Sequence, residues 1–453
     1  MTSNSLRDLD IACTLHPYTN LRKHERQGPL VVTRGQGVRV YDEAGKEYID
    51  AMAGLWCSSL GFSEPRLAAA AKRQMERLGF YHQFSHKAHS PGIELAARLV
   101  DMAPVPMSKV FFANSGSESI DTAIKLVWYF NNAIGRPKKK KIIARHQAYH
   151  GVTVAAASLT SLAVNHRDFD VPLDRMLHVT CPQAYHHALP GEDDEAFSQR
   201  LADELEALIL KEDPDSVAAF FAEPVMGAGG VIVPPAGYFP RIQAVCRKYD
   251  LLMLADEVIC GFHRTGNVWG CQTFDYAPDM ITCAKALSAG FLPVSALLLN
   301  DRIYQVVADN SAKIGGFGHG FTYGGHPVSC AVALEALDIY AERDIAGHVR
   351  RVAPLMQAGL ASLADHPLVG EVRGVGLIGA LELVADKAAR RNFPPELAVA
   401  PRVVDAMQRN GLVGRAMMND SLAFSPPLVV EEDELNAIVA LTRRSLDEVA
   451  AGL

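Results

Sequence analysis

Long apolar runs, a secretory signal and an excess of positive charge are all missing from this sequence. No uninterrupted apolar stretch approaches the roughly 20 residues that a membrane-spanning helix needs. Residues 1–10 have neither the basic start nor the apolar core of a signal peptide. The net charge of −7 argues against nucleic acid or an anionic membrane as the main partner. We therefore expect a soluble, cytoplasmic protein.

Metal-binding and disulfide patterns are also missing. The eight cysteines include no C-x-x-C pair, and several lie in apolar segments, which is typical of reduced thiols in the cytosol. The H-E-x-x-H pattern is absent. His82, His86 and His89 have suggestive spacings, but no third ligand with a recognisable spacing accompanies them. The sequence predicts no metal site.

What the sequence does contain is a long alternation of apolar strands with helical patterns. Near-continuous apolar strands are expected where helices cover both faces of a sheet, so the pattern predicts an α/β domain with a mostly parallel sheet. A mixed pattern after Pro327 predicts a smaller α+β domain. The lysine run 138–141 follows Gly135-Arg136-Pro137 and is interpreted as a solvated loop. The segments that we expect to be strands are 109–114, 141–146, 176–180, 217–223, 251–258, 280–284 and 294–300.

Lys285 and Asp256 each stand where one of these strands ends. Lys285 is flanked by small and apolar residues, so partial desolvation should favour its neutral, nucleophilic amine. A pyridoxal phosphate enzyme needs such an amine and a carboxylate that keeps the pyridine nitrogen protonated. A lysine that extends from a core strand to solvent is the commoner alternative for a single lysine.

Other strand ends carry groups that suit a phosphorylated, planar ligand. Ser115-Gly116-Ser117 opens a helix, where free amides and hydroxyls favour an anion, although an ordinary helix cap explains them equally well. Tyr149-His150-Gly151 offers an aromatic for stacking, with a structural turn as the alternative. Glu223 precedes a glycine loop, and Gly320-Phe321-Thr322 offers a second anion contact. Ligands bind where the strands of an open parallel sheet end.

Taken together, these motifs resemble the class III aminotransferases of pyridoxal 5'-phosphate (PLP) fold type I. The resemblance covers essentially the whole chain, and the ω-transaminases, or amine–pyruvate transaminases, are the most similar subclass. It rests on Asn114-Ser115-Gly116-Ser117-Glu118, Tyr149-His150-Gly151, Glu223-Pro224-Val225, Asp256-Glu257-Val258, Arg264-Thr265-Gly266, Lys285 and Gly320-Phe321-Thr322.

The resemblance implies a division of the chain and a set of roles. Residues 61–328 would form a large PLP-binding domain, and the segments 1–60 and 329–453 would together form a small one. Lys285 would hold PLP covalently and carry the proton, while Asp256 would pair with the pyridine nitrogen. The remaining implied cofactor contacts are Ser115, Gly116, Ser117, Tyr149, His150, Glu223, Val258, Phe321 and Thr322.

The implied substrates are a primary amine and a keto acid. Arg415 would clamp the acceptor carboxylate and swing out to admit an uncharged amine; a surface ion pair is its alternative. Related acetylornithine enzymes have a carboxylate-binding arginine at the position of Val152, so its absence argues for pyruvate over 2-oxoglutarate. The implied substrate pocket comprises Tyr18, Trp56, Phe84, Tyr149, Ala228 and Arg415.

The resemblance also implies a homodimer, or a tetramer of two such dimers, because Thr322 would reach the cofactor phosphate of the neighbouring subunit. Two other functions stay open at this point. The chain could catalyse another PLP reaction, as an aminomutase or a decarboxylase, or it could be a silent relative used for binding. Retention of Lys285 and Asp256 speaks against a silent protein.

Overall fold

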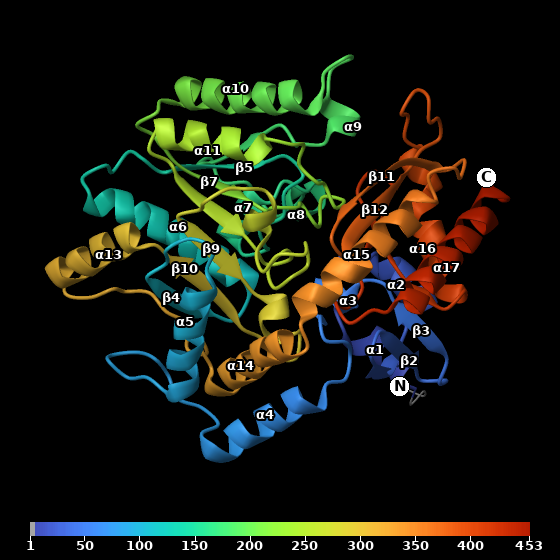
Figure 1. Ribbon diagram of the computed structural model, residues 1–453, viewed down its shortest axis with the longest axis horizontal. Coiled ribbons are helices and arrows are strands. Elements are labelled where there is room, and N and C mark those ends of the chain that lie inside the picture. The colour runs from blue at the N-terminus through green and yellow to red at the C-terminus, as the bar shows by residue number, and fades with distance from the viewer. Residues whose placement is uncertain (1–4) are drawn as a thin grey trace.

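The computed structural model describes residues 5–453, so residues 1–4 of the expected N-terminal segment lie outside the described part. A seven-stranded sheet in the order β4-β10-β9-β8-β7-β5-β6 forms the centre of the molecule (Figure 1). Its strands are β4 (Lys109–Ala113), β5 (Lys141–Arg145), β6 (Met176–Val179), β7 (Val217–Ala222), β8 (Leu252–Asp256), β9 (Met280–Cys283) and β10 (Ser295–Leu299).

The pairings from β9 to β6 are all parallel, whereas β10 runs antiparallel to both β9 and β4. The expected α/β class with a mostly parallel sheet is therefore confirmed. In a parallel sheet the carboxyl ends of the strands share one edge, and polar side chains that follow different strands are brought together there.

Both faces of this sheet are buried, which explains why its strands are apolar without alternation. Phe220 and Met253 belong to one hydrophobic cluster with the helices α10 (Asp194–Glu212) and α11 (Tyr238–Lys248). The next residues along the same strands, Phe221 and Leu254, belong to a second cluster with α6 (Gly116–Ala133). Successive side chains on a strand point to opposite faces, so each neighbouring pair serves both layers.

The N- and C-terminal parts of the chain lie side by side (Figure 1, blue and red). The strand β3 (Glu47–Asp50) pairs in parallel with β13 (Leu412–Val413), in a sheet of order β1-β2-β3-β13. The other strands here are β1 (Val32–Gln36), β2 (Arg39–Asp42), β11 (Val369–Val375), β12 (Ile378–Leu383), β14 (Arg415–Met417) and β15 (Ser421–Phe424), of which the last four form a sheet in the order β11-β12-β15-β14.

The helix α14 (Pro327–Glu342) crosses the domain boundary expected at 328/329 and packs on α4 (Pro65–Arg77) and α5 (Ser90–Met102). The remaining α-helices are α1 (Leu6–Cys13), α2 (Leu21–Gln27), α3 (Ala53–Trp56), α7 (Val154–Leu159), α8 (Ala163–His166), α9 (Ala184–His187), α12 (Gly270–Thr273), α13 (Asp301–Ile314), α15 (Ile345–Ala361), α16 (Val399–Arg409) and α17 (Glu432–Ala450). The 3₁₀ turns are η1 (Lys285–Ser288) and η2 (Pro395–Leu397).

One expectation is wrong in part. Lys138 is exposed, but the lysine run 138–141 is not solvated throughout, because Lys139 is only 4% exposed. Its ammonium donates hydrogen bonds to the main-chain oxygens of Tyr249, at 2.8 Å, and Pro214, at 3.4 Å. Carbonyl oxygens that remain free at the ends of neighbouring segments thus compensate the burial of the charge.

None of the helices within residues 5–453 is long and apolar enough to cross a membrane.

Candidate active site

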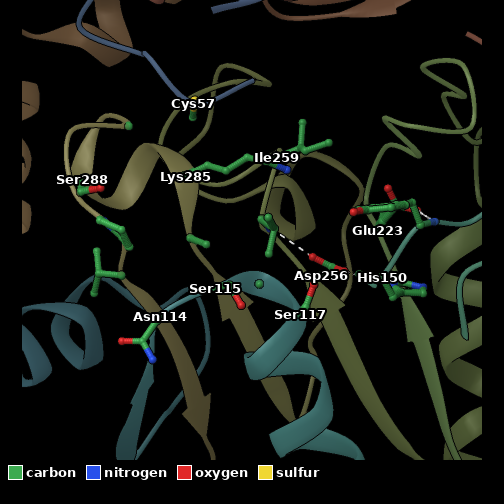
Figure 2. Close-up of a pocket in the computed structure, with 18 of the residues that line it drawn as sticks. Cys57, Asn114, Ser115, Ser117, His150, Glu223, Asp256, Ile259, Lys285 and Ser288 are labelled. Carbon is green, nitrogen blue, oxygen red and sulfur yellow. Dashed lines mark hydrogen bonds and ion pairs between the residues drawn. The ribbon is translucent and has the colours of Figure 1, made fainter. Parts of the chain in front are cut away.

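A cavity of about 350 Å³ opens at the carboxyl edge of the parallel strands. Figure 2 shows Lys285 and Cys57 on one side of it, Ser115 and Ser117 on the opposite side, and Asp256 beside His150. Nine of the residues expected to bind the cofactor line this cavity. They are Ser115, Gly116, Ser117, Tyr149, His150, Glu223, Asp256, Val258 and Lys285.

Lys285 is separated from β9 by Ala284 and begins the 3₁₀ turn η1. Its φ of +47° lies in the left-handed region, which a non-glycine residue adopts only when the surrounding structure imposes it. Burial lowers the pKa of the Lys285 ammonium, although the charges of Asp256 and Glu223 act in the opposite direction. The side chain therefore presents a more readily neutralised amine than an exposed lysine does.

Asp256 ends β8 and is only 5% exposed. Its Oδ2 atom lies 2.8 Å from Nδ1 of His150, and its Oδ1 atom accepts a hydrogen bond from the amide of Val258 at 3.2 Å. The imidazole of His150 is fully buried and its Nε2 atom has no partner among the described residues. With the proton assigned to Nδ1, His150 donates to Asp256 and fixes the direction of the carboxylate.

Glu223 follows β7 and ties two loops of the site together. Its carboxylate accepts the amide of Tyr149 at 3.0 Å and the amide of Gly227 at 3.1 Å. Glu223 is 4% exposed, and burial raises the pKa of its carboxyl group. These bonds hold Tyr149 at the cavity wall and fix the start of the glycine loop.

The opening of α6 forms the floor of the cavity. Ser115 is the N-cap, and its hydroxyl accepts the amide of Glu118 at 3.2 Å, so the capping interpretation is confirmed for this side chain. A Cβ atom on Gly116 would lie 3.1 Å from Val258, and one on Gly151 would lie 2.5 Å from Oγ of Ser117. Two glycines thus leave room where amides of a helix N-terminus face the cavity, an arrangement that suits a phosphate.

Trp56 and Arg415 lie beside the cavity on segments from opposite ends of the chain. The Arg415 guanidinium carbon is 5.0 Å from the centre of a Trp56 ring, and Nζ of Lys285 is 5.9 Å from it. Trp56 is 4% exposed, and burial lowers the pKa of Arg415. The arginine belongs to no salt bridge in the described part of the chain, so the surface ion pair considered as its alternative is absent there.

Tyr18 lies on the segment between α1 and α2, and its hydroxyl accepts a hydrogen bond from Asn165 at 2.5 Å. Asp10 joins the two ends of this segment, because its Oδ2 atom lies 2.8 Å from Nε2 of His16 and 2.9 Å from Nε2 of His24. This cluster of three residues was not predicted from the sequence, because its members come from two helices and a loop and do not have the spacing of a metal-binding motif. Tyr18 is 56% exposed and does not line the cavity.

The other predicted residues do not line the cavity in this chain. Trp56 and Arg415 adjoin it as described, while Ala228 lies in the glycine loop after Glu223 and does not line it. Phe84 is 43% exposed and contacts Gly320, next to Phe321. Thr322 is exposed.

Part of the cavity wall was not predicted from the sequence. The missed residues follow strand ends or come from loops whose course only the tertiary structure gives, and no motif marks them. They are Cys57, Ile259, Ala284, Ser288, Gly290, Leu292, Pro293 and Val294.

The chemistry of the site fits PLP. An amine for the aldehyde, a buried carboxylate for the pyridine nitrogen and a glycine-lined helix start for the phosphate converge on one cavity. The cavity volume lies in the range of cofactor and ligand pockets.

Comparisons with known proteins agree with this chemistry. Residues 21–445 match the class III aminotransferase family. Gamma aminobutyrate transaminase 1, mitochondrial, of Solanum lycopersicum is 49% identical over 435 residues, covering 96% of this chain and 84% of that protein. The ω-transaminase of Pseudomonas jessenii in complex with PMP is 52% identical, with a TM-score of 0.97 and coverage of 99% and 98%.

A thermostable ω-transaminase variant engineered for asymmetric synthesis of enantiopure bulky amines has the same TM-score of 0.97, with 52% identity and 99% coverage of both chains. The fold, the site chemistry and these matches lead to one conclusion: the chain belongs to the class III aminotransferases, enzymes of PLP fold type I that depend on pyridoxal 5'-phosphate.

Proposed function

We propose that this enzyme is an ω-transaminase that moves the amino group of a primary amine to pyruvate, giving an aldehyde or ketone and alanine in two half-reactions. The observation that carries the proposal is the pairing of Arg415 with Trp56 beside Lys285. An arginine held against an aromatic ring, with no carboxylate bound to it among the described residues, is free to bind a substrate carboxylate. An apolar amine would pack on the aromatic surface of Trp56 and would not need the charge of Arg415.

The residues of the cavity have separate roles in this proposal. PLP, when bound, supplies the electron sink. Asp256 holds the proton on the pyridine nitrogen, and His150 orients Asp256. Lys285 binds the cofactor and moves the proton at the substrate carbon. Tyr149 and Val258 would hold the cofactor ring, and Gly116 and Ser117 would hold its phosphate.

The engineered ω-transaminase supports the roles of the pocket residues. Its name records replacement of a tryptophan, a phenylalanine and an arginine that are separated by 28 and 331 positions, as Trp56, Phe84 and Arg415 are here. Those replacements accompany use with bulky amines. The equal spacing supports our proposal that Trp56, Phe84 and Arg415 belong to one substrate pocket.

The similarity to γ-aminobutyrate transaminases favours a second donor class. An ω-amino acid carries its amine at one end and a carboxylate at the other. Arg415 is then the group that receives this carboxylate in the donor half-reaction, as it receives pyruvate in the other. Under this candidate function, one arginine serves both substrates.

We also propose that the working unit is a homodimer. Thr322 and Phe84 are exposed in one protomer, yet the proposed roles place Thr322 at a cofactor phosphate and Phe84 at a substrate pocket. A second copy that brings both loops to the opposite cavity reconciles the exposure with these roles.

A panel of donors and acceptors tests the function. The donors to compare are 1-phenylethylamine, an aliphatic amine, a diamine and γ-aminobutyrate, each with pyruvate and with 2-oxoglutarate as acceptor. Alanine should form from pyruvate with at least one uncharged amine. Activity with γ-aminobutyrate and none with uncharged amines would select the second function, and use of 2-oxoglutarate alone would contradict both.

A further inference from the structure

The loop that carries Trp56 has an unusual backbone. Ala53 and Trp56 have φ values of +46° and +57°, and Gly54, between them, has +66°. Side chains with a Cβ disfavour the left-handed region, so two such residues in four positions need bonds from outside the loop to hold them. The short helix α3 supplies part of these bonds, because the amides of Trp56 and Cys57 donate to the oxygens of Met52 at 2.8 Å and Ala53 at 3.0 Å. Gly54 and Leu55 depart from helical geometry, so the turn that contains them needs a further partner.

Asp50 supplies bonds of the required kind. It ends β3, is 5% exposed, and its Oδ1 atom accepts the amide of Met52 at 2.7 Å and the amide of Gly54 at 3.2 Å. A carboxylate that accepts two main-chain amides makes charge-assisted bonds, which are stronger than bonds between neutral groups. These bonds fix the first turn of the loop, immediately before Trp56.

The residues on either side of Asp50 bind the segment that leads to Arg415. The amide of Ile49 donates to the oxygen of Gly411 at 2.9 Å, and the amide of Ala51 donates to the oxygen of Val413 at 3.0 Å. Asp50 therefore lies at the junction from which one segment leads to Trp56 and the other leads to Arg415.

From this geometry we propose that Asp50 is a positioning residue for substrate selection, because it sets the loop that holds Trp56 against Arg415. The proposal rests on the proposed roles of Trp56 and Arg415 in binding amine and keto acid. It predicts that Asp50 acts through Trp56, since its carboxylate bonds to the loop amides and does not line the cavity.

The test uses the PLP-loaded enzyme and the variants D50A, D50N, W56A and D50A/W56A. D50A should raise the KM for the keto acid by roughly tenfold, with kcat changed by less than about threefold. This range is expected because two charge-assisted bonds are lost and the loss affects the substrate only through Trp56. D50N keeps an acceptor oxygen and should recover most of the defect. In the double variant, D50A should add little to the effect of W56A.

Asp42 offers a matched control. It stands at the other end of the same hairpin and accepts the amides of Ala44 at 3.0 Å and Lys46 at 2.9 Å. D42A should lower thermal stability without a change in KM. If D50A does not fold, D50S, whose shorter hydroxyl can reach fewer amides, replaces it in the same cycle.

Two results would overturn the proposal. One is full additivity of D50A and W56A in KM, and the other is an equal fall of kcat and kcat/KM in D50A with no recovery in D50N. The cycle is run with whichever keto acid the donor and acceptor panel identifies. Failure of pyruvate as acceptor would therefore contradict the proposed function and leave the test of Asp50 intact.

Discussion

The Nδ1 atom of His150 lies 2.8 Å from Oδ2 of Asp256, and both side chains are buried beneath the cavity. The aspartate can face a pyridine nitrogen only if its carboxylate keeps one orientation. His150 enforces this orientation on one oxygen, and the amide of Val258 binds the other.

Replacement of His150 tests this relationship. H150F removes the donor and should lower kcat by roughly tenfold to a hundredfold, the range for loss of a hydrogen bond to a charged group, about 1.5–3 kcal/mol. Bound PLP should remain, because the lysine and the phosphate contacts are unchanged. Steady-state rates and cofactor absorbance measure the two effects. An unchanged kcat would show that Asp256 is oriented without His150.

Arg415 should separate the two half-reactions. In R415A, amination of the cofactor by 1-phenylethylamine should survive, because a donor without a carboxylate needs no carboxylate clamp. The return reaction with pyruvate should weaken by about 1.5–3 kcal/mol, roughly tenfold or more, through loss of a charge-assisted contact. Single-turnover absorbance changes follow each half. Equal loss in both halves would assign a structural role to Arg415.

Mixed dimers test the contribution of Thr322 across subunits. T322A should bind PLP roughly tenfold more weakly, as expected for one lost bond to a phosphate. In a heterodimer of K285A and T322A protomers, one site combines an intact Lys285 with an intact Thr322 if the threonine acts on the neighbouring cofactor. That site should bind PLP with wild-type affinity. Weak binding at it would mean that Thr322 acts within its own protomer.

Glu257 should make the stability of the folded protein depend on pH. Its buried carboxylate accepts the amides of Gly270 at 2.8 Å and Cys271 at 2.7 Å, and burial raises its pKa from 4.5 to about 7. A raised folded-state pKa means that the folded protein binds the proton more tightly. The stability that this proton contributes is therefore present below pH 4.5 and is lost as the pH rises to about 7, by on the order of 3 kcal/mol.

E257Q does not titrate, so its melting temperature relative to wild type should rise between pH 5 and pH 8. Thermal unfolding of both proteins across this range measures the difference. A difference that stays constant with pH would contradict the raised pKa. Comparison of the two proteins removes the contribution of every other titrating group that they share.

Periodic, well-capped elements were predictable from the sequence. The apolar spacing of residues 194–212 predicts a helix, and the structure has α10, Asp194–Glu212, in that place, with Asp193 capping its start. The helix α13 was not predicted, although Ile303, Val306 and Val307 have helical spacing and pack on the cluster that contains α6. Strands with both faces covered were recognised by their continuous apolar character.

The site was predictable where it depends on strand ends. The proximity of Asp256, Glu223 and Lys285 could be predicted, because the carboxyl ends of parallel strands lie at one edge of the sheet. The place of Cys57 could not be predicted, because it depends on the left-handed residues Ala53 and Trp56, and the role of Asp50 depends on the same loop, whose path no spacing in the sequence encodes. The burial of Lys139 was not predicted either, because its carbonyl partners come from segments that are distant in the sequence.

The most direct test of the central claim, that Lys285 holds the cofactor and carries the proton of amine transfer, is single-turnover absorbance of PLP-loaded wild type and K285A. Wild type should convert its cofactor with a primary amine and restore it with pyruvate, and borohydride should fix the cofactor to the chain. K285A should fold, give no turnover and release its cofactor after borohydride. Full turnover in K285A would contradict the account.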